Sequence, residues 1–594
     1  MNMNILSKKI SEKPVLRQLL APLWGKMPAG QKGVILTLFT LLFTLSSCSD
    51  MLETDSSMIE FAEQNKLNSS RDTVRSLLGV VRGIQTIADR TFILGDIRSD
   101  QVVTTASATT AIKQIANFEV DAENPYNKVS DYYAIINNCN YYIANADTAL
   151  VNLGKKVFEK EYAAIKTYRA WTYLQLVKNY GQVPLVLDPV LTEAEATAEM
   201  NKTYSDINTI CNYFIEDIKP YVDTESPAVI KAYMQIPVRV LLGELCLWAG
   251  KYKEAAQYLH EYLTMKNAPV PTGRLNGNIL EYAKLHGTFY ATPNRSAYTF
   301  DSGEMLCYIP MATSDYEGVK SEISTVYESV LANNYYAQIE PSQALKKLSA
   351  DQNYVYCVEA SQTERDTLYV TKGVWPQEFM DGDLRLYCTL SRSTENVDEA
   401  SPFSRERIKN RKASYSYSPY SRMWFYRVQQ VYLMYAEALN RLGCPEAALC
   451  VLKYGLRNQN IERYVSEKER EKAGTLLDFD DEVFTKDNTL GVHARGCGDV
   501  DCDKNYCVPQ PPTALASYED TVQYQIPLVE QMIIDEYGLE FTFEGKRFYD
   551  LMRIALRRND PAYLADAIAK RNGKIDDALR SKLMDKRNWF LPLR

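Results

Sequence analysis

The stretch that decides the fold is Arg239-Val-Leu-Leu-Gly-Glu-Leu-Cys-Leu-Trp-Ala-Gly-Lys-Tyr-Lys-Glu-Ala-Ala256. Apolar residues at helical spacing run up to Gly250, and a second run that contains Tyr252 and Ala256 follows after a turn. Small residues allow two helices to cross closely, and a glycine suits the turn between them. This combination is typical of a tetratricopeptide helix pair.

Three further stretches have the same helical character. A second copy of the pattern runs from Tyr432 to Gly443 and continues at Pro445-Glu-Ala-Ala448. Helical spacing also extends over residues 129–180, where Gly181 ends it, and over residues 527–557. The two tetratricopeptide-like pairs are unequally spaced, so we expect a degenerate array. The predicted fold class is all-α, a tetratricopeptide-like helical scaffold with long loop-rich insertions.

Two stretches interrupt this helical pattern. Between residues 268 and 424 the helical period is lost except near residues 325–348, and Pro, Gly, Ser, Thr and Asn become frequent. A second irregular stretch covers about 478–526. Because loops on a rigid scaffold vary without disturbing the core, the first stretch is the predicted ligand face. The predicted regions are a signal segment (1–47), an N-terminal helical region (48–267), a loop-rich insertion (268–424) and a C-terminal helical region (425–594).

Composition restricts the class of protein. The chain has 594 residues, a net charge of −8, 46% hydrophobic and 24% charged residues, which excludes collagen, a disordered chain and a polytopic membrane protein. The acidic balance argues against a nucleic-acid partner, because phosphate backbones are bound mainly by clustered Lys and Arg. Tyrosine is in excess, at 42 residues against 18 Phe and 6 Trp. Such rings either pack half-buried helix faces or form a stacking surface for a ligand.

The first fifty residues have the pattern of an export signal. Basic residues precede an uncharged apolar run, Val34–Leu45, whose 12 residues are too few for a spanning helix. The following Leu45-Ser-Ser-Cys48 resembles the lipobox of bacterial lipoproteins, in which Cys48 is lipidated and becomes the mature N-terminus. An ordinary signal peptide with a chance cysteine is the alternative, and Met27 is an alternative start to Met1. Removal of residues 1–47 takes away six basic residues and one acidic residue, so the net charge moves from −8 to −13.

Motifs of several enzyme classes are missing from the sequence. There is no His-Glu-x-x-His, no Gly-x-Ser-x-Gly, no Walker loop and no dinucleotide fingerprint. The three histidines, His260, His286 and His493, are not at metal-ligand spacing. These absences disfavour metalloproteases, α/β hydrolases and nucleotide enzymes, and we expect neither a metal nor a cofactor. A glycosidase stays open, because its two carboxylates come from distant positions and leave no spacing signature.

One cysteine cluster differs from the single cysteines of the predicted helices. Cys497, Cys502 and Cys507 are spaced unlike the ligands of common zinc sites. In an exported protein a loop disulfide is the favoured interpretation, with its pairing open. Oxygen-bearing side chains also alternate here as at the start of a calcium loop, but the expected Gly and the final Glu are missing, so calcium binding stays open. These side chains are Asp499, Asp501, Asp503 and Asn505.

Several motifs occur together, in order, over nearly all of residues 48–594. Besides the lipobox they include the helix Val431–Leu442 and the ending Trp589-Phe-Leu-Pro592. Three longer segments are Leu94-Gly-Asp-Ile-Arg-Ser-Asp-Gln101, Ala163–Val186 and Glu540-Phe-Thr-Phe-Glu-Gly-Lys-Arg-Phe-Tyr-Asp-Leu-Met-Arg553. This set resembles the SusD/RagB family, the nutrient-binding outer-membrane lipoproteins of Bacteroidetes.

The resemblance implies a binding protein on an all-helical frame, not an enzyme. Family members capture glycans, or in some cases peptides, and deliver them to a SusC-type TonB-dependent transporter. The acidic segment Ser49–Asp55 resembles a surface-export signal, which implies a lipid-anchored protein on the outer face of the outer membrane. We therefore expect a surface lipoprotein that captures a glycan for such a transporter. The alternatives are a peptide ligand, a surface glycosidase, or a tetratricopeptide adhesin or scaffold.

Sugar recognition requires flat aromatic rings for stacking beside polar groups for hydrogen bonds. For each candidate tyrosine the alternative is a packed or simply exposed ring. Asp96, Arg98 and Asp100 have a different alternative, an internal salt-bridge set that fixes a loop. The candidate ligand-binding residues are Arg98, Asp100, Gln101, Tyr290, Tyr298, Tyr316 and Trp375.

Overall fold

The structure is a computed structural model, in which Leu67–Arg594 form one compact unit. Within the described residues, no helix is long and apolar enough to cross a membrane. The domain boundaries proposed from the sequence stay predictions. The residues that the structure describes are 67, 70–228, 230, 234–265, 280–285, 288–293, 305–312, 318–327, 337–359, 365–370, 382–383, 385–386, 390–392, 406–408, 422–484, 490–498 and 503–593.

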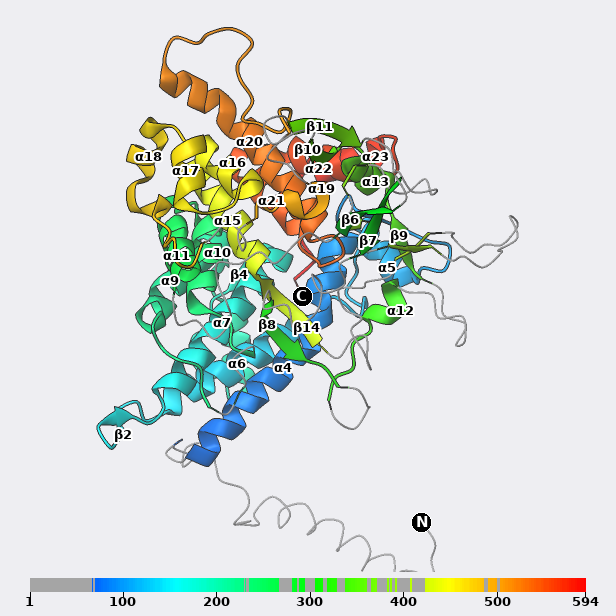
Figure 1. Cartoon of the computed structure of the whole chain (residues 1–594). Coiled ribbons are helices and arrows are strands. Elements are labelled where there is room, and N and C mark those ends of the chain that lie inside the picture. The colour runs from blue at the N-terminus through cyan, green and yellow to red at the C-terminus, as the bar shows by residue number, and fades with distance from the viewer. Residues whose placement is uncertain are drawn as a thin grey trace, which may run out of the picture. The chain divides into compact units, whose positions relative to one another are not determined.

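Successive helices pack against one another through the first half of the frame (Figure 1). α4 (Ser70–Ile97) packs on α6 (Val129–Asn145), which packs on α7 (Glu159–Tyr180). α7 contacts α9 (Ile207–Ile218), and α9 contacts α10 (Val238–Ala249). Nearly every residue in the last five turns of α7 is buried, including polar side chains such as Arg169 and Asn179. The helical stretch predicted over residues 129–180 forms two helices, α6 and α7, and α7 ends at Tyr180 just before Gly181, as predicted.

Both predicted tetratricopeptide-like pairs are present. α10 packs on α11 (Tyr252–Thr264), and α15 (Val428–Arg441) packs on α16 (Pro445–Lys453). A Cβ at Gly243 would lie 2.6 Å from a methyl group of Leu259, so only glycine allows α10 and α11 to cross at this distance. Because α11 also contacts α15, the two pairs join into one helical array. The all-α, tetratricopeptide-like prediction is confirmed.

The C-terminal helices begin earlier than the sequence suggested. α20 (Tyr518–Glu540) starts nine residues before Pro527, which lies inside the helix. The hydroxyl of Ser517 accepts a hydrogen bond from the N–H of Asp520 and caps the helix, and this cap determines where it begins. The prediction that residues 518–526 are irregular is therefore wrong. The later elements are α21 (Arg547–Arg558), α22 (Pro561–Ala569), α23 (Asp577–Leu583) and the 3-10 turn η7 (Lys586–Trp589).

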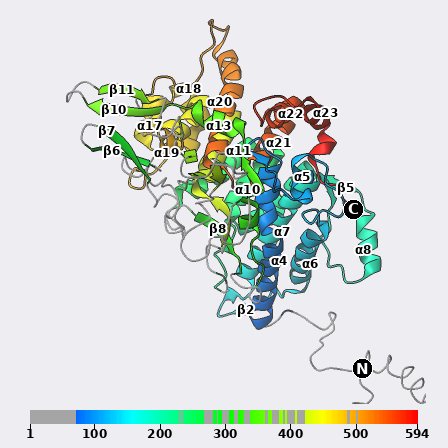
Figure 2. The same ribbon diagram turned by 90° about the vertical axis from the view of Figure 1, so that its right-hand side faces the viewer.

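Strands among the described residues form only two-stranded sheets. Figures 1 and 2 place the hairpin β2–β3 (Val151–Asn152, Lys155–Lys156) and the hairpin β10–β11 (Tyr354–Glu359, Arg365–Val370) at opposite ends of the unit. β4 (Gln182–Pro184) pairs with β5 (Tyr204–Asp206) between α7 and α9. The remaining pairs are β1–β9 (Val102–Thr104, Ile339–Pro341), β6–β7 (Leu280–Leu285, Thr288–Pro293), β8–β14 (Met305–Pro310, Arg422–Arg427) and β12–β13 (Leu390–Arg392, Glu406–Ile408).

The smaller helices lie between these elements or after α16. Two of them, α12 and α13, belong to the predicted insertion, whose described parts otherwise consist of short strands. This agrees with the loss of helical period that the sequence shows there. The helices are α5 (Thr110–Ala116), α8 (Glu193–Met200), α12 (Ile323–Tyr327), α13 (Gln343–Ala350), α17 (Asn458–Tyr464), α18 (Glu467–Ala473) and α19 (Ala494–Cys497), with the 3-10 turns η1 (Lys219–Tyr221) and η5 (Gly474–Leu477).

A network of buried ion pairs connects α20 with the insertion and with the end of β14. Arg385 pairs with Asp383 at 2.6 Å and with Glu536 at 2.8 Å, and Arg427 pairs with Glu540 at 3.1 Å. All five side chains are at most 5% exposed. A buried charge without a partner is strongly destabilising, so each residue of this network depends on the others.

Candidate functional site

Three of the predicted ligand residues lie in the interior, at and just after the end of α4. Arg98, Asp100 and Gln101 are 1%, 8% and 1% exposed. The carboxylate of Asp100 accepts two hydrogen bonds from the Arg547 guanidinium, at 2.8 and 2.9 Å. The side-chain amide of Gln101 donates to the main-chain oxygen of Gly538 at 2.6 Å. At Asp100 this geometry corresponds to the alternative reading, an internal ion pair that fixes the loop against α20 and α21.

Arg98 has a different environment from Asp100. Its guanidinium donates to the main-chain oxygens of Leu94 (2.8 Å) and Trp589 (3.0 Å) and to the side-chain oxygen of Asn179 (2.6 Å). It also lies 4.2 Å from the ring centroid of Phe548. All of these partners are neutral, and burial lowers the pKa of the Arg98 guanidinium.

The other candidates from the sequence lie where the structure describes no side chains. Tyr290 is in β7, whose side chains are not described. The remaining candidates, which lie outside the described residues, are Tyr298, Tyr316, Trp375 and the lipidation candidate Cys48. The roles of all five residues stay predictions.

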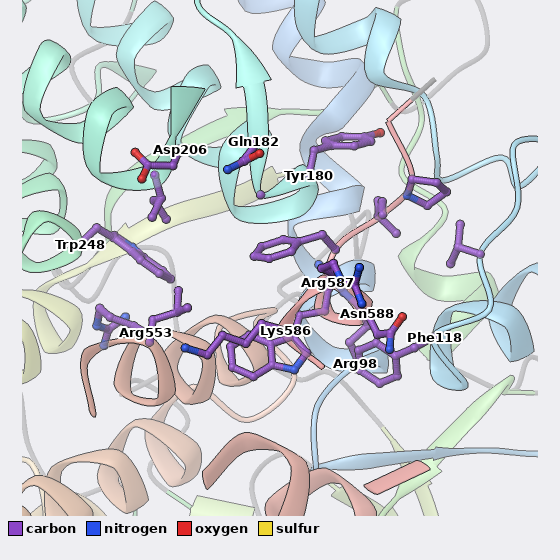
Figure 3. Close-up of a pocket in the computed structure, with 18 of the residues that line it drawn as sticks. Arg98, Phe118, Tyr180, Gln182, Asp206, Trp248, Arg553, Lys586, Arg587 and Asn588 are labelled. Atoms are coloured by element: carbon purple, nitrogen blue, oxygen red, sulfur yellow. The ribbon is translucent and has the colours of Figure 1, made fainter. Parts of the chain in front are cut away.

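A cavity of about 880 Å³ opens beside Arg98 (Figure 3). It is lined by the last residues of the chain together with the ends of α7, β5, α10 and α21 and the start of α9. Figure 3 shows Asp206 and Gln182 on one side of it and Lys586, Arg587 and Asn588 on the other. Pockets that bind small ligands have volumes of roughly 300–1,000 Å³, so an oligosaccharide unit fits in this space.

The C-terminal segment is held rigidly as one wall of the cavity. The indole N–H of Trp589 donates to the oxygen of Leu583 at 2.7 Å, and the N–H of Leu591 donates to the oxygen of Asn179 at 2.8 Å. Gly181, at the end of α7, has φ +78°, and a Cβ there would lie 2.8 Å from the ring of Phe590. Only glycine therefore lets the tail lie this close to α7.

The charged groups of the cavity fall into two kinds. Arg553 is paired with Glu437 at 2.7 Å and with Asp550 at 2.9 Å, and these carboxylates raise its pKa although burial lowers it. Arg587 is exposed and paired with Asp585 at 2.6 Å. For the other three cations, Arg98, Arg557 and Lys586, no described carboxylate lies within ion-pair distance.

Two of these three cations reach the cavity from half-buried positions. Arg557 makes a single weak hydrogen bond to Asn208, at 3.4 Å, and burial lowers its pKa. Lys586 donates to the side-chain oxygen of Asn559 at 2.6 Å. Asp206 is the one carboxylate among the lining residues that the structure describes, and its oxygen caps the start of α9 through the N–H of Thr209.

Two neutral groups that line the cavity have no hydrogen-bond partner in the part of the chain that the structure describes. The hydroxyl of Tyr180 and the indole N–H of Trp248 make no hydrogen bond to any described residue, although both atoms are buried. A buried polar atom without a partner costs roughly 1–3 kcal/mol, so such atoms are commonly satisfied by water or by a ligand. Both groups can donate, which favours a ligand that brings acceptor oxygens.

A separate cluster offers possible metal ligands, but it is already occupied by a cationic side chain. Asp383, His493 and Cys497 have ligand atoms within 4.8 Å of one another, and all three are buried. Asp383 accepts hydrogen bonds from Arg385 at 2.6 and 3.0 Å, and His493 contacts Glu536 through Nδ1. Because the arginine already provides the positive charge, these residues fit an internal ion network better than a metal centre.

The cysteine cluster near this site shows no disulfide among its described members. Cys497 is a buried free thiol and Cys507 an exposed free thiol, so the predicted loop disulfide does not join them. The Cys497 thiol points at Asp383, 3.3 Å away, and burial raises its pKa. Asp503 accepts a hydrogen bond from the N–H of Asn505 within its own loop. Cys502, Asp499 and Asp501 lie outside the described residues.

Sequence reasoning missed most of the cavity. Of its lining residues only Arg98 was a candidate, and Trp589–Pro592 was noted as a family-like ending alone. The lining comes from seven segments between residues 98 and 592, and none of them carries a local binding motif. The one usable signal was the cluster of basic residues at 586–587 beside Trp589 and Phe590.

Comparisons with known proteins agree with this fold. Residues 507–593 match the model of the SusD family. No curated protein matches the sequence. Among solved structures, a SusD-like carbohydrate-binding protein from Bacteroides fragilis NCTC 9343 is 14% identical, with a TM-score of 0.52 over 83% of this chain and 88% of that chain.

Two further solved structures share the fold at similarly low sequence identity. A SusD superfamily protein from Bacteroides vulgatus ATCC 8482 is 13% identical, with a TM-score of 0.52 over 86% of this chain and 92% of that chain. NanU of B. fragilis is 18% identical, with a TM-score of 0.50 over 88% of this chain and 95% of that chain. The matched segment contains α20, α21 and the tail that forms one wall of the cavity. Residues 507–593 thus match the SusD family, and the solved structures show that the chain shares the fold of SusD-like proteins.

Proposed function

We propose that the protein is a cell-surface lipoprotein that captures a glycan and delivers it to a SusC-type TonB-dependent transporter of the outer membrane. The observation that carries this proposal is the match of residues 507–593 to the SusD family, on a chain that shares the fold of SusD-like proteins. It is supported by the similar fold of a protein from B. fragilis described as carbohydrate-binding. The cavity adds a space of sugar size with rings beside polar groups.

The chemistry of the cavity favours binding over catalysis. Glycoside hydrolysis generally uses two carboxyl groups on either side of the bond that breaks. The described lining contains one carboxylate, Asp206, and this group already caps α9. Phe118 and Phe590 present rings, while Gln182, Asn208 and Asn588 present groups that can hydrogen-bond hydroxyls. Such a set can hold a sugar without providing an acid and a nucleophile.

Anchoring by lipid at Cys48 is part of the same proposal. Leu67, the first described residue, is nineteen positions after Cys48, and an extended chain of this length spans at most about 65 Å. Several acyl chains hold a protein on a bilayer surface without a spanning helix. The tether is therefore long enough to let the helical unit meet a transporter in the same membrane.

Affinity capture from detergent-solubilised membranes tests the delivery step. The full chain, tagged at its C-terminus, should co-purify with a TonB-dependent barrel protein. Labelled palmitate should enter the wild type and the control Cys507→Ala, whose exposed thiol is unrelated to anchoring, but not Cys48→Ala. Capture without any barrel protein would contradict the transporter partner, and labelling of Cys48→Ala would contradict the anchor.

A further inference from the structure

We propose that the cavity beside Arg98 binds the anionic group of an acidic sugar, a carboxylate or a sulfate. This rests on the proposed function only in taking the ligand to be a glycan. The site is defined by Arg98, Arg557 and Lys586 together with the donors of Tyr180 and Trp248.

The charge of the cavity is opposite to that of the whole chain. The protein has a net charge of −8, yet five cations and one carboxylate line this space. The two cations that have carboxylate partners, Arg553 and Arg587, add little net charge. Among the described lining residues, Asp206 alone opposes the other three, so this part of the cavity has a net positive charge.

Burial makes the uncompensated charge of Arg98 significant. Its side chain is 1% exposed, and its hydrogen bonds go to neutral oxygens. An isolated buried charge is costly in a medium of low dielectric constant, and an anion nearby relieves that cost. The pattern is therefore that of a site which gains from an incoming carboxylate or sulfate, and a neutral sugar would not supply this gain.

The remaining lining provides for the rest of a sugar. Tyr180 and Trp248 can donate to acceptor oxygens without giving up existing hydrogen bonds. The half-buried rings of Phe118 and Phe590 offer faces for the C–H groups of a pyranose. Asp206 and Gln182, on the opposite side in Figure 3, can accept from hydroxyl groups. Cations at one wall and hydroxyl acceptors at the other would orient an acidic sugar.

A titration with matched sugars tests this inference. The probes are a galacturonate trisaccharide, the same trisaccharide after reduction of its carboxyl groups, and a sulfated trisaccharide. Trp248 and Trp589 line the cavity, so tryptophan fluorescence reports occupancy directly, and calorimetry gives the affinity. We expect at least one anionic probe to bind ten-fold or more tightly than the reduced probe, and its binding to weaken as salt rises. The anionic probe that binds identifies the group as carboxylate or sulfate.

Substitutions in the lining test whether the anionic probe binds in this cavity. Arg98 also holds the tail in place, so the informative changes are Arg557→Gln and Lys586→Gln, at residues that are only half-buried. Each should weaken the anionic probe by about ten-fold, which corresponds to about 1.4 kcal/mol. Lys574→Gln removes the same charge at an exposed position away from the cavity and should leave the affinity unchanged.

The outcomes separate this inference from the proposed function. Binding of neutral glycans with no preference for the anionic probes would overturn the inference and leave glycan capture standing. Anionic binding that neither Arg557→Gln nor Lys586→Gln reduces would place the anion elsewhere and also overturn the inference. Failure of both neutral and anionic probes in a broad glycan panel would overturn the inference and glycan capture together.

Discussion

The guanidinium of Arg98 donates a hydrogen bond to the main-chain oxygen of Trp589, 3.0 Å away, although the two residues are 491 positions apart. Arg98 follows α4, the first helix of the described unit, and Trp589 closes the last turn of the chain. This contact brings the two ends of the unit together. It also fixes the position of the C-terminal segment, which forms one wall of the cavity.

Replacement of Arg98 by methionine should destabilise the protein strongly. The change leaves the buried main-chain oxygens of Leu94 and Trp589 without this donor, while the side-chain oxygen of Asn179 keeps its hydrogen bond from Tyr549. Each buried acceptor without a partner costs roughly 1–3 kcal/mol, so we expect a loss of at least about 2 kcal/mol in the free energy of unfolding in urea. Arg587→Met, at an arginine that is 89% exposed, should leave the urea midpoint nearly unchanged. Equal midpoints for the two variants would contradict the role of Arg98.

The buried pair of Asp100 and Arg547 should matter far more than an exposed pair. Asp100→Ala leaves the Arg547 guanidinium buried without its carboxylate, which should cost about 3–5 kcal/mol. Asp351→Ala breaks an ion pair with Lys347 whose side chains are 55% and 75% exposed, and it should cost less than about 1 kcal/mol. Chemical denaturation of both variants measures the difference. A loss below 1 kcal/mol for Asp100→Ala would show that this residue does not hold the loop.

Gly181 should be far less replaceable than Gly154, although both have positive φ, at +78° and +76°. An alanine pays about 1 kcal/mol for the left-handed backbone at either position. At Gly154 a Cβ meets nothing within 4 Å, whereas at Gly181 it meets the ring of Phe590 at 2.8 Å. Gly181→Ala should therefore lose about 1–3 kcal/mol more and make the tail accessible to carboxypeptidase. Equal stability and equal resistance of the two alanine variants would contradict the packing of Phe590 on α7.

Glu469 should make stability depend on pH. Its carboxyl group accepts hydrogen bonds from the N–H groups of Glu446 and Ala447 at the start of α16, and burial raises its pKa to about 7 from 4.5. The folded state therefore favours the neutral acid. Its contribution to stability is full below about pH 4.5 and is lost as the pH rises to about 7.

The variant Glu469→Gln tests this dependence, because its side chain cannot ionise. Relative to the wild type, the variant should gain up to about 3 kcal/mol in the free energy of unfolding between pH 4.5 and pH 8. Urea unfolding of both proteins across this range gives the difference. A difference that stays constant with pH would show that Glu469 does not titrate in the folded protein near neutral pH.

The helical frame was predictable because its packing is local in sequence. Gly243 and Leu259 belong to one helix pair, so the small residue and the apolar periodicity that it serves are visible together in one short stretch. The start of α20 was not predicted, because Pro527 resembles a helix start while the capping residue Ser517 follows an irregular stretch. A proline inside a helix is uncommon, and the pattern alone favours the wrong boundary.

The candidate site was predictable only in part, because distant segments build it. Polar residues after α4 indicated a surface loop, but Arg547 and the tail around Trp589 cover Arg98 and Asp100. These partners are more than 400 positions away in the sequence, and no local sequence pattern predicts them. Asp100 is buried in an ion pair with Arg547, in agreement with the alternative of an internal salt bridge. Arg98, in contrast, lines the cavity.

Calorimetry combined with recovery of the sugar distinguishes a protein that binds a glycan from one that cleaves it. The purified protein is titrated by calorimetry with a panel of neutral and acidic oligosaccharides, and each sugar is then recovered and its chain length is determined. We expect saturable binding of at least one glycan, with its length unchanged after long incubation. Shortened products that disappear on a single Asp or Glu substitution, or no binding anywhere in the panel, would contradict it.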